Sequence, residues 1–147
     1  MASRPHRSRA RLCAAALALW AAAVLALTLG SGLAALVCGA PLARHAANWR
    51  PFVSIINQLR WGTRAQIWRQ LGGNLLLFFP FGLLAPSVWP RLRRFVPALL
   101  CAAAGSAAIE GAQYFLGRMT DVDDLLLNTA GAALGWLCWF LFCRGRR

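Results

Sequence analysis

The acidic side chains of this 147-residue chain all lie within one window of fifteen residues. They are Glu110, Asp121, Asp123 and Asp124. The other charged side chains are sixteen arginines, and there is no lysine. Carboxylates so close together could supply the oxygen ligands that Mg²⁺ prefers, with an arginine binding a phosphate. This window is therefore the first place to look for chemistry.

Glu110 is the only charged residue of an apolar run, Phe95–Gly117, that is long enough to span a membrane. A carboxylate at the centre of a membrane helix costs roughly 2.5–3.5 kcal/mol on insertion scales, so such a residue is by default a functional candidate. Gln113 follows three residues later and would share its helix face. The alternative is structural, with both side chains only hydrogen-bonding to Asn74 or Asn128 and gluing the helices together.

The spacing of the aspartates indicates the start of another helix. Thr120 and Asp123 have the spacing of a capping box, with aspartate in place of the usual glutamate or glutamine. Acidic residues in a first helical turn also complement the helix dipole. Asp121, Asp124 and Asn128 follow at intervals that would place them on one helix face. A helix start explains two of the three aspartates but not why every acid of the chain lies here.

Small residues extend this polar face. Gly131 and Gly135 form a small-xxx-small surface of the kind at which membrane helices approach closely. The Phe95–Gly117 run offers Ala107 and Gly111, so we expect these two runs to pack closely against each other. We predict that the polar residues of these segments form one cluster near the outer surface: Asn74, Glu110, Gln113, Arg118, Asp121, Asp123, Asp124 and Asn128.

The composition is that of an integral membrane protein. Hydrophobic residues make up 59% of the chain and charged residues 14%, whereas soluble domains average roughly 45–50% and about 25%. The mean hydropathy is +0.54. Four apolar runs reach the ~17–25 residues that a membrane helix needs: Leu12–Val37, Leu71–Trp89, Phe95–Gly117 and Leu125–Phe142. The sequence thus predicts an all-α fold, a four-helix bundle that spans the membrane.

These runs also define the predicted domain organisation. The first could be a secretory signal, but signal cores have only ~7–15 apolar residues, so an uncleaved span is predicted. In the second, Gly72-Gly73-Asn74 opens the helix and Pro80-Phe81-Gly82 is expected to interrupt it, which neighbouring helices can tolerate. We divide the chain into a basic N-terminus (residues 1–11), a single transmembrane domain (12–142) and a basic C-terminal tail (143–147).

The connection between the first two runs, Gly39–Gln70, is more than a linker. Its apolar residues recur at helical spacing, and tryptophans of the kind found at membrane interfaces accompany them. We expect a short amphipathic helix or re-entrant segment on the outer leaflet, with an ordinary loop anchored by tryptophans as the alternative. The residues concerned are Phe52, Val53, Ile56 and Leu59 for the helix and Trp49, Trp61 and Trp68 for the anchors.

The arginines indicate the orientation. Ten lie on one predicted face: Arg4, Arg7, Arg9, Arg11, Arg91, Arg93, Arg94, Arg144, Arg146 and Arg147. Six lie on the other: Arg44, Arg50, Arg60, Arg64, Arg69 and Arg118. The positive-inside rule then places both termini in the cytoplasm and the acidic window outside. We expect a multi-pass protein of the bacterial cell membrane.

Two other classes of protein are disfavoured. A net charge of +12 could suggest nucleic-acid binding, but nucleic-acid binders gather basic residues on a solvated face, and here arginines flank apolar runs. The five cysteines lack Cys-x-x-Cys spacing and are predicted to pack as small free hydrophobes. They are Cys13, Cys38, Cys101, Cys138 and Cys143. No disulfide, metal site or cofactor is expected from them.

Several of these residues carry a resemblance to a known family. The segment Gly73–Gly82 resembles the second-span signature of VanZ-like membrane proteins. The segment from Ile109 to Gly131 is similar to the second signature of that family, and Arg50-Pro51-Phe52 matches its Pro-Phe element. The resemblance covers roughly residues 48–140. The family is named for a protein associated with low-level resistance to teicoplanin, a glycopeptide that binds cell-wall precursors.

Three functions follow as hypotheses. The first is a non-enzymatic, VanZ-like membrane protein of the outer leaflet that modulates access of a glycopeptide or a lipid-linked cell-wall precursor. The second is a Mg²⁺-dependent enzyme acting on a lipid-linked phosphate, although His6 and His45 are poor candidates for a base and Ser106 lacks a base–orienter pair. The third is proton- or ion-coupled transport by a homo-oligomer through Glu110. The sequence favours a protein without catalytic activity and without a cofactor.

Overall fold

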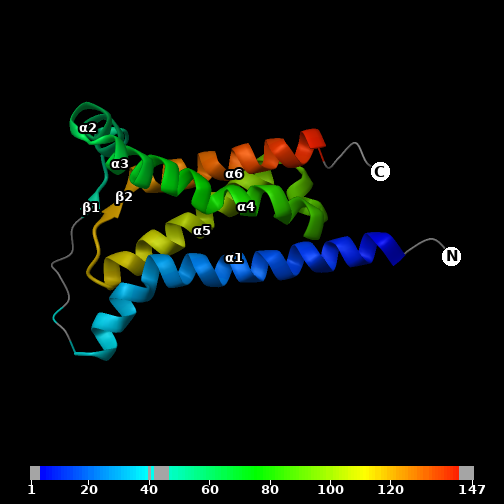
Figure 1. Cartoon of the computed structure of the whole chain (residues 1–147), viewed down its shortest axis with the longest axis horizontal. Coiled ribbons are helices and arrows are strands. Elements are labelled where there is room, and N and C mark those ends of the chain that lie inside the picture. The colour runs from blue at the N-terminus through cyan, green and yellow to red at the C-terminus, as the bar shows by residue number, and fades with distance from the viewer. Residues whose placement is uncertain (1–3, 40, 42–46, 143–147) are drawn as a thin grey trace.

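The computed structural model describes residues 4–39, 41 and 47–142, with the side chains of residues 4–7 left out. Its long helices are α1 (Arg4–Val37), α4 (Gly73–Val88), α5 (Phe95–Phe115) and α6 (Val122–Phe142). They lie alongside one another as a bundle (Figure 1). Four helical segments are long and apolar enough to cross a membrane: Ser8–Val37, Arg64–Val88, Phe95–Phe115 and Val122–Phe142. The predicted all-α, four-span membrane fold is confirmed.

The second span differs from its prediction in where the helix is irregular. Residues Arg64–Val88 form one continuous helical segment: α3 (Arg64–Ile67), the π-helical turn η1 (Trp68–Gly72) and then α4. Pro80 and Pro86 both lie inside α4, so the predicted interruption at Pro80-Phe81-Gly82 is wrong. Each proline removes one main-chain donor, which a helix packed among neighbours tolerates. The irregular turn η1 lies inside this segment, between α3 and α4.

Helices α4 and α6 pack most closely, through glycines. A Cβ on Gly82 would overlap the carbonyl oxygen of Ala132, and a Cβ on Gly131 or Gly135 would overlap carbonyl oxygens of α4. The glycine face of α6 thus contacts the second span rather than the Phe95–Gly117 run. Helix α5 does pack against α6, as predicted, but through other residues such as Ser106 and Asn128. A Cβ on Gly111 would meet no atom within 4 Å.

Helix α1 covers the remaining side of the bundle. The indole Nε1 of Trp20 donates to the carbonyl oxygen of Leu77 at 2.6 Å. The same indole meets the ring of Phe78 edge-on at 5.6 Å. Among the other described hydrophobic side chains of α1, only Leu17 and Val24 are buried. The helix is thus attached to the bundle along one narrow stripe.

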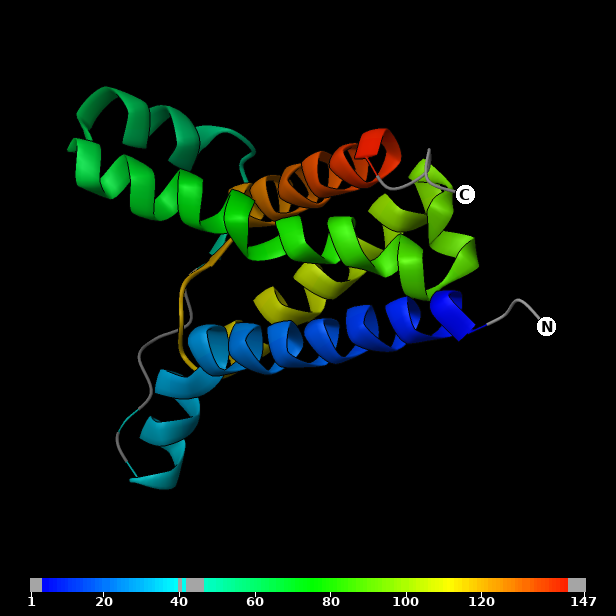
Figure 2. The same cartoon turned by 45° about the vertical axis from the view of Figure 1, so that its right-hand side comes forward.

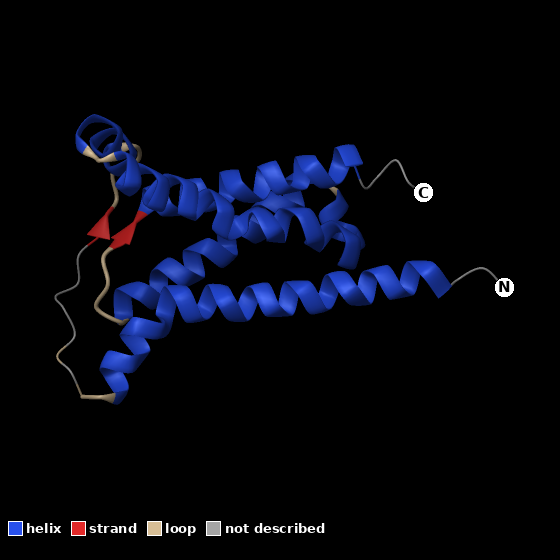
Figure 3. Ribbon diagram, viewed as in Figure 1, coloured by secondary structure: helices blue, strands red, loops and turns tan. Residues whose placement is uncertain are grey.

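One short helix and two short strands lie at one end of the bundle. The helix is α2 (Val53–Trp61), which lies beside the α3–η1 segment (Figure 2). A two-residue strand β1 (Ala47–Asn48) pairs in parallel with β2 (Thr120–Asp121), with Asn48 opposite Asp121 (Figure 3). The predicted amphipathic segment does form a helix, since Ile56 and Leu59 lie in α2. Its location on a leaflet stays a prediction.

The opposite end is rich in arginine. The start of α1, the 3₁₀ turn η2 (Pro90–Arg93) and the end of α6 meet there, while β1, β2 and α2 lie at the far end (Figure 1). The predicted tail, residues 143–147, together with residues 1–3, Arg44 and His45, lies outside the described residues. The domain division itself stays a prediction. The helix ends that lead to the two termini share one end of the bundle, as an even number of spans requires.

The described cysteines are free. Cys38 and Cys101 are exposed, while Cys13 and Cys138 are partly buried. Burial was expected for all of them, because each lies in an apolar run. In a bundle of spans much of the apolar surface faces outward, so an apolar run does not by itself mean a buried side chain. Cys143 lies outside the described residues.

Candidate functional site

Seven of the eight residues of the predicted polar cluster line one cleft of about 690 Å³. The cleft is bounded by α1, η1, α4, α5 and α6 and by the loop that joins α5 to β2. The seven residues are Asn74, Glu110, Gln113, Arg118, Asp121, Asp124 and Asn128. The structure thus brings together side chains from α4, α5, the loop after α5, β2 and α6. Of the eight predicted residues, only Asp123 does not line the cleft.

Asp124 holds the second span against the fourth. It lies in the first turn of α6, where a negative charge complements the helix dipole. Its Oδ1 accepts a hydrogen bond from Asn74 Nδ2 and another, at 3.2 Å, from Gln70 Nε2. Asn74 therefore has Asp124 as its partner rather than Glu110 or Gln113. Gln70 belongs to the π-helical turn, and nothing in the sequence pattern marked it as part of the site.

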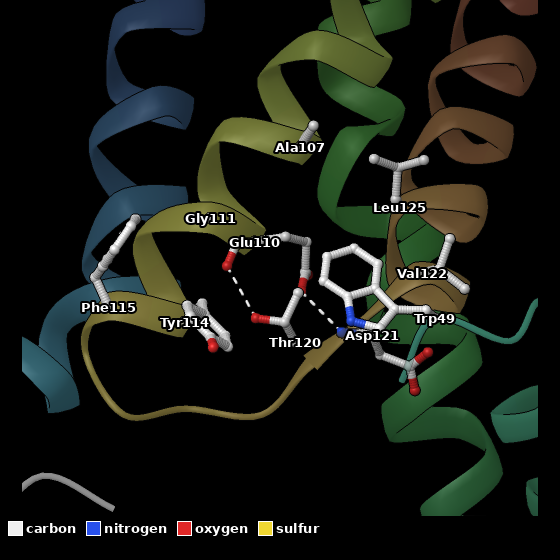
Figure 4. Close-up of a pocket in the computed structure, with 10 residues that line it drawn as sticks. All are labelled: Trp49, Ala107, Glu110, Gly111, Tyr114, Phe115, Thr120, Asp121, Val122 and Leu125. Carbon is white, nitrogen blue, oxygen red and sulfur yellow. Dashed lines mark hydrogen bonds between the residues drawn. The ribbon is translucent and has the colours of Figure 1, made fainter. Parts of the chain in front are cut away.

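Glu110 attaches the acidic loop to α5. Its side chain is 7% exposed, and Oε2 accepts a hydrogen bond from the main-chain N–H of Asp121 at 3.1 Å. The hydroxyl of Thr120 donates to the Glu110 carbonyl oxygen at 3.0 Å. Both contacts are drawn in Figure 4. The glutamate thereby positions β2 directly in front of α6.

Arg118 and Gln113 reach across to α1 rather than to Glu110. Arg118 Nη1 and Gln113 Nε2 donate to the carbonyl oxygen of Thr28 at 2.7 Å and 3.0 Å. Arg118 follows Gly117, whose positive φ of 71° reverses the chain after α5. The backbone of Thr28 could not have been recognised as a site component from the sequence, because any residue offers a carbonyl oxygen.

Asn128 lies one helical turn below Asp124 on α6. It is 3% exposed, and its Nδ2 donates to the hydroxyl of Ser106 at 2.9 Å. Its Oδ1 is buried and has no hydrogen-bond partner among the described residues. Ser106, which is fully buried on α5, thus takes the structural role that the sequence had suggested for Glu110 and Gln113.

The start of α6 differs from the predicted helix start. Asp121 precedes α6 and its Oδ1 accepts from the main-chain N–H of Asp123 at 3.0 Å, so the cap is Asp121 and the predicted capping box of Thr120 is wrong. Asp121 Oδ1 also accepts from Asn48 Nδ2 at 3.1 Å. Because Asp121 lies in β2, only Asp124 and Asn128 share the predicted helix face. The burial of Thr120 against α5 explains the difference.

Asp123 points away from the cleft toward α2. Its Oδ1 accepts from the N–H of Phe52 at 2.5 Å and its Oδ2 from the N–H of Ile55 at 3.0 Å. The aspartate therefore caps the first turn of a helix some seventy residues earlier, which local spacing could not reveal. Phe52 itself has a left-handed conformation, with φ 67°.

These features can be compared with known proteins. A family model described as VanZ/LLP1 matches residues 14–143, which is most of the chain. The chain belongs to the VanZ/LLP1 family. The resemblance of the Gly73–Gly82 and Ile109–Gly131 segments is thereby confirmed. No curated protein and no solved structure matches it.

In this VanZ/LLP1 protein each of the three aspartates has a different hydrogen-bond partner. Asp121 accepts from Asn48 and Asp123, Asp123 from the N-terminus of α2, and Asp124 from η1 and α4. Among the described residues no group of three or more histidine, cysteine or acidic side chains could hold a metal ion. The Mg²⁺ site of the enzyme hypothesis therefore stays a prediction.

A second hollow of this family member lies on the other side of Glu110 (Figure 4). It has a volume of about 510 Å³ and is lined mainly by apolar side chains. Among them are Phe115 of α5, Leu125 of α6 and Trp49, which follows β1. Glu110 and Asp121 line both hollows. A polar cleft and an apolar pocket are thus separated by the same two acidic residues.

Proposed function

We propose that this VanZ/LLP1 family member is a non-enzymatic binding protein at the outer leaflet of the bacterial cell membrane. Its ligand would be a lipid-linked intermediate of the cell envelope, and binding would change the access of a glycopeptide such as teicoplanin to its target. The observation that carries the proposal is the cleft of about 690 Å³, where polar side chains from α4, α5, the loop after α5, β2 and α6 meet at one end of a membrane bundle.

The distribution of arginine supports an outward-facing cleft. Arg9 and Arg11 of α1 and the arginines around η2 lie at the end of the bundle opposite β2. Basic residues next to membrane spans favour the cytoplasmic side. With that end inside, the acidic residues and α2 lie at the outer surface and both termini are cytoplasmic.

The contacts of the carboxylates support binding rather than catalysis. Each of the four acidic side chains accepts a hydrogen bond that joins two separate parts of the chain or caps a helix. A serine nucleophile is commonly activated by an adjacent base, whereas the Ser106 hydroxyl accepts a hydrogen bond from Asn128. The apolar pocket beside Glu110 is suited to the hydrocarbon part of a membrane-borne ligand.

The proposal is tested by antibiotic susceptibility. The chain is expressed in a susceptible Gram-positive host, and the inhibitory concentrations of teicoplanin and vancomycin are compared with those of the empty vector. We expect a higher value for teicoplanin alone. The variant Asp124→Asn should reduce the increase, because Asp124 lines the cleft.

The matched control is Thr129→Val on the same helix, whose hydroxyl donates to the Leu125 carbonyl oxygen. It should keep the full increase at equal expression. No change in teicoplanin susceptibility with well-expressed protein would contradict the proposal. Loss of the effect after chelation of divalent cations would instead support the enzyme hypothesis.

A further inference from the structure

The cleft contains a buried acceptor that nothing in the described part of the chain satisfies. Asn128 is 3% exposed and lines the cleft. Its Nδ2 donates a hydrogen bond to the Ser106 hydroxyl, and its Oδ1 has no hydrogen-bond partner among the described residues. Buried polar atoms are nearly always hydrogen-bonded, and leaving one unpaired costs free energy. An orphaned oxygen in the wall of a cleft therefore points to a ligand that brings a donor.

Two carboxylates of the same cleft use only one oxygen each in the hydrogen bonds of the described residues. Asp124 uses Oδ1 for both Asn74 and Gln70, and no described donor contacts its Oδ2. Glu110 uses Oε2 for the Asp121 N–H, and no described donor contacts its Oε1. The cleft thus combines an amide oxygen and two carboxylates, which are acceptors only when ionised. A ligand with several N–H donors and a positive charge matches this set.

Positive charge lies at the exposed part of the same lining. Arg69 and Arg118 both line the cleft and are exposed. Arg118 donates through Nη1 to Thr28, and neither guanidinium forms an ion pair with a described carboxylate. Guanidinium groups bind phosphate through paired N–H donors. The cleft can therefore take a cation at its acidic groups and an anion at its arginines.

We propose that the cleft binds a membrane-borne ligand with a primary ammonium group next to a phosphate. Phosphatidylethanolamine is a simple lipid with this headgroup chemistry and serves as the probe. The ammonium, with three donors, would lie among Asn128, Asp124 and Glu110, and the phosphate at Arg69 and Arg118. A lipid is the favoured source because the adjoining pocket is apolar and the site lies in a membrane bundle. This inference rests on the proposed function, because it names the chemical class of the ligand at the same cleft.

The test uses the full chain in lipid nanodiscs. Phosphatidylethanolamine, phosphatidylcholine or phosphatidylglycerol with identical acyl chains is added to a common background lipid. Thermal unfolding is followed by tryptophan fluorescence, and retained lipid by native mass spectrometry. A ligand that binds the native state raises its unfolding midpoint. We expect phosphatidylethanolamine to raise the midpoint and to be retained above the other two.

The choice of lipids isolates the donor groups. Phosphatidylcholine has the same phosphate and the same charge, but methyl groups replace its N–H donors. Phosphatidylglycerol keeps the phosphate and offers hydroxyls without a cation. Equal retention of phosphatidylethanolamine and phosphatidylcholine would overturn the proposal. Stabilisation by soluble phosphoethanolamine at the same headgroup concentration would assign a soluble ligand and overturn the lipid source.

Two variants test the position of the ammonium. Asn128→Leu removes the orphaned oxygen, and Asp124→Asn removes a charge while keeping an acceptor for Asn74. Each should abolish the difference between the two zwitterionic lipids, and Thr129→Val should preserve it. Asn128→Leu also loses the hydrogen bond to Ser106 and could unfold for that reason. In that case the lipid preference of Asp124→Asn alone tests the position of the ammonium group. A difference between the lipids that persists in Asp124→Asn would overturn the assignment.

The outcome is distinguishable from that of the susceptibility test. A shift in teicoplanin susceptibility without a preference for phosphatidylethanolamine would leave the proposed function and overturn this ligand. A preference for phosphatidylethanolamine without any shift would support the ligand class and contradict the role in glycopeptide access.

Discussion

The carboxylate of Asp123 at the start of α6 caps the N-terminus of α2, with its Oδ1 2.5 Å from the main-chain nitrogen of Phe52. The two residues are 71 positions apart in sequence. Asp123 is 1% exposed, so this contact is buried although α2 has no buried residue of its own. The N-terminus of α2 is thus capped by a side chain of the fourth span.

We expect Asp123→Ala to release α2. Loss of a helix N-cap costs about 0.5–2 kcal/mol, and hydrogen bonds to a charged group contribute about 1.5–3 kcal/mol. A loss of about 2 kcal/mol should appear in denaturation of the protein in detergent micelles. Hydrogen exchange should accelerate at residues 53–61. Asp124→Ala is the control, because Asp124 does not contact α2, and unchanged exchange in the Asp123 variant would refute the cap.

The glycines of the α4–α6 contact should not tolerate a methyl group. In Gly82→Ala and Gly135→Ala the new Cβ would overlap carbonyl oxygens of Ala132 and Phe79. Forcing extra atoms into a packed contact costs about 1–3 kcal/mol. Gly111→Ala is the matched control, since a Cβ there meets no atom within 4 Å, and it should be neutral or gain about 0.5–1 kcal/mol of helix stability. Equal melting temperatures for all three variants would contradict the packing.

Glu110→Gln should separate the structural role of the residue from its charge. The amide oxygen can still accept the Asp121 N–H that Glu110 Oε2 accepts at 3.1 Å, so the unfolding free energy should change by less than about 1 kcal/mol, the usual size of one hydrogen bond. The teicoplanin effect should fall because the cleft loses a negative charge. Glu110→Leu should lower the unfolding free energy and also abolish the teicoplanin effect. A fully active Glu110→Gln protein would show that the charge is dispensable.

The orientation can be checked by labelling. In a background where the native cysteines are replaced, Asn57→Cys on α2 and Arg91→Cys in η2 are placed at exposed positions at opposite ends of the bundle. A membrane-impermeant maleimide should label Asn57→Cys in intact cells and Arg91→Cys only after lysis. The reverse pattern would place the cleft on the cytoplasmic side and contradict the proposed function.

Much of the architecture could be predicted because it depends on local properties of the chain. The length of an apolar run decides whether a helix can cross a bilayer, and this gave four spans in the right places. The cost of a carboxylate among apolar residues singled out Glu110. The ends of the spans were less certain: the fourth begins at Val122 rather than Leu125, because polar residues near the cap are also helical.

The partners of the polar residues could not be predicted, because they are decided by packing. Asn74 and Asp124 are 50 residues apart, and Arg118 and Thr28 are 90 apart. Which helix receives the glycine face of α6 depends on the shapes of all four spans, and the structure selects α4 rather than α5.

The sequence by itself therefore determined the spans, their number and the side chains with an energetic cost in a membrane. Only the tertiary structure decided that seven of those side chains line one cleft while Asp123 leaves it to cap α2. The physical reason is that burial cost belongs to a residue and its neighbours in the chain, whereas a hydrogen bond between segments exists only after the helices have packed.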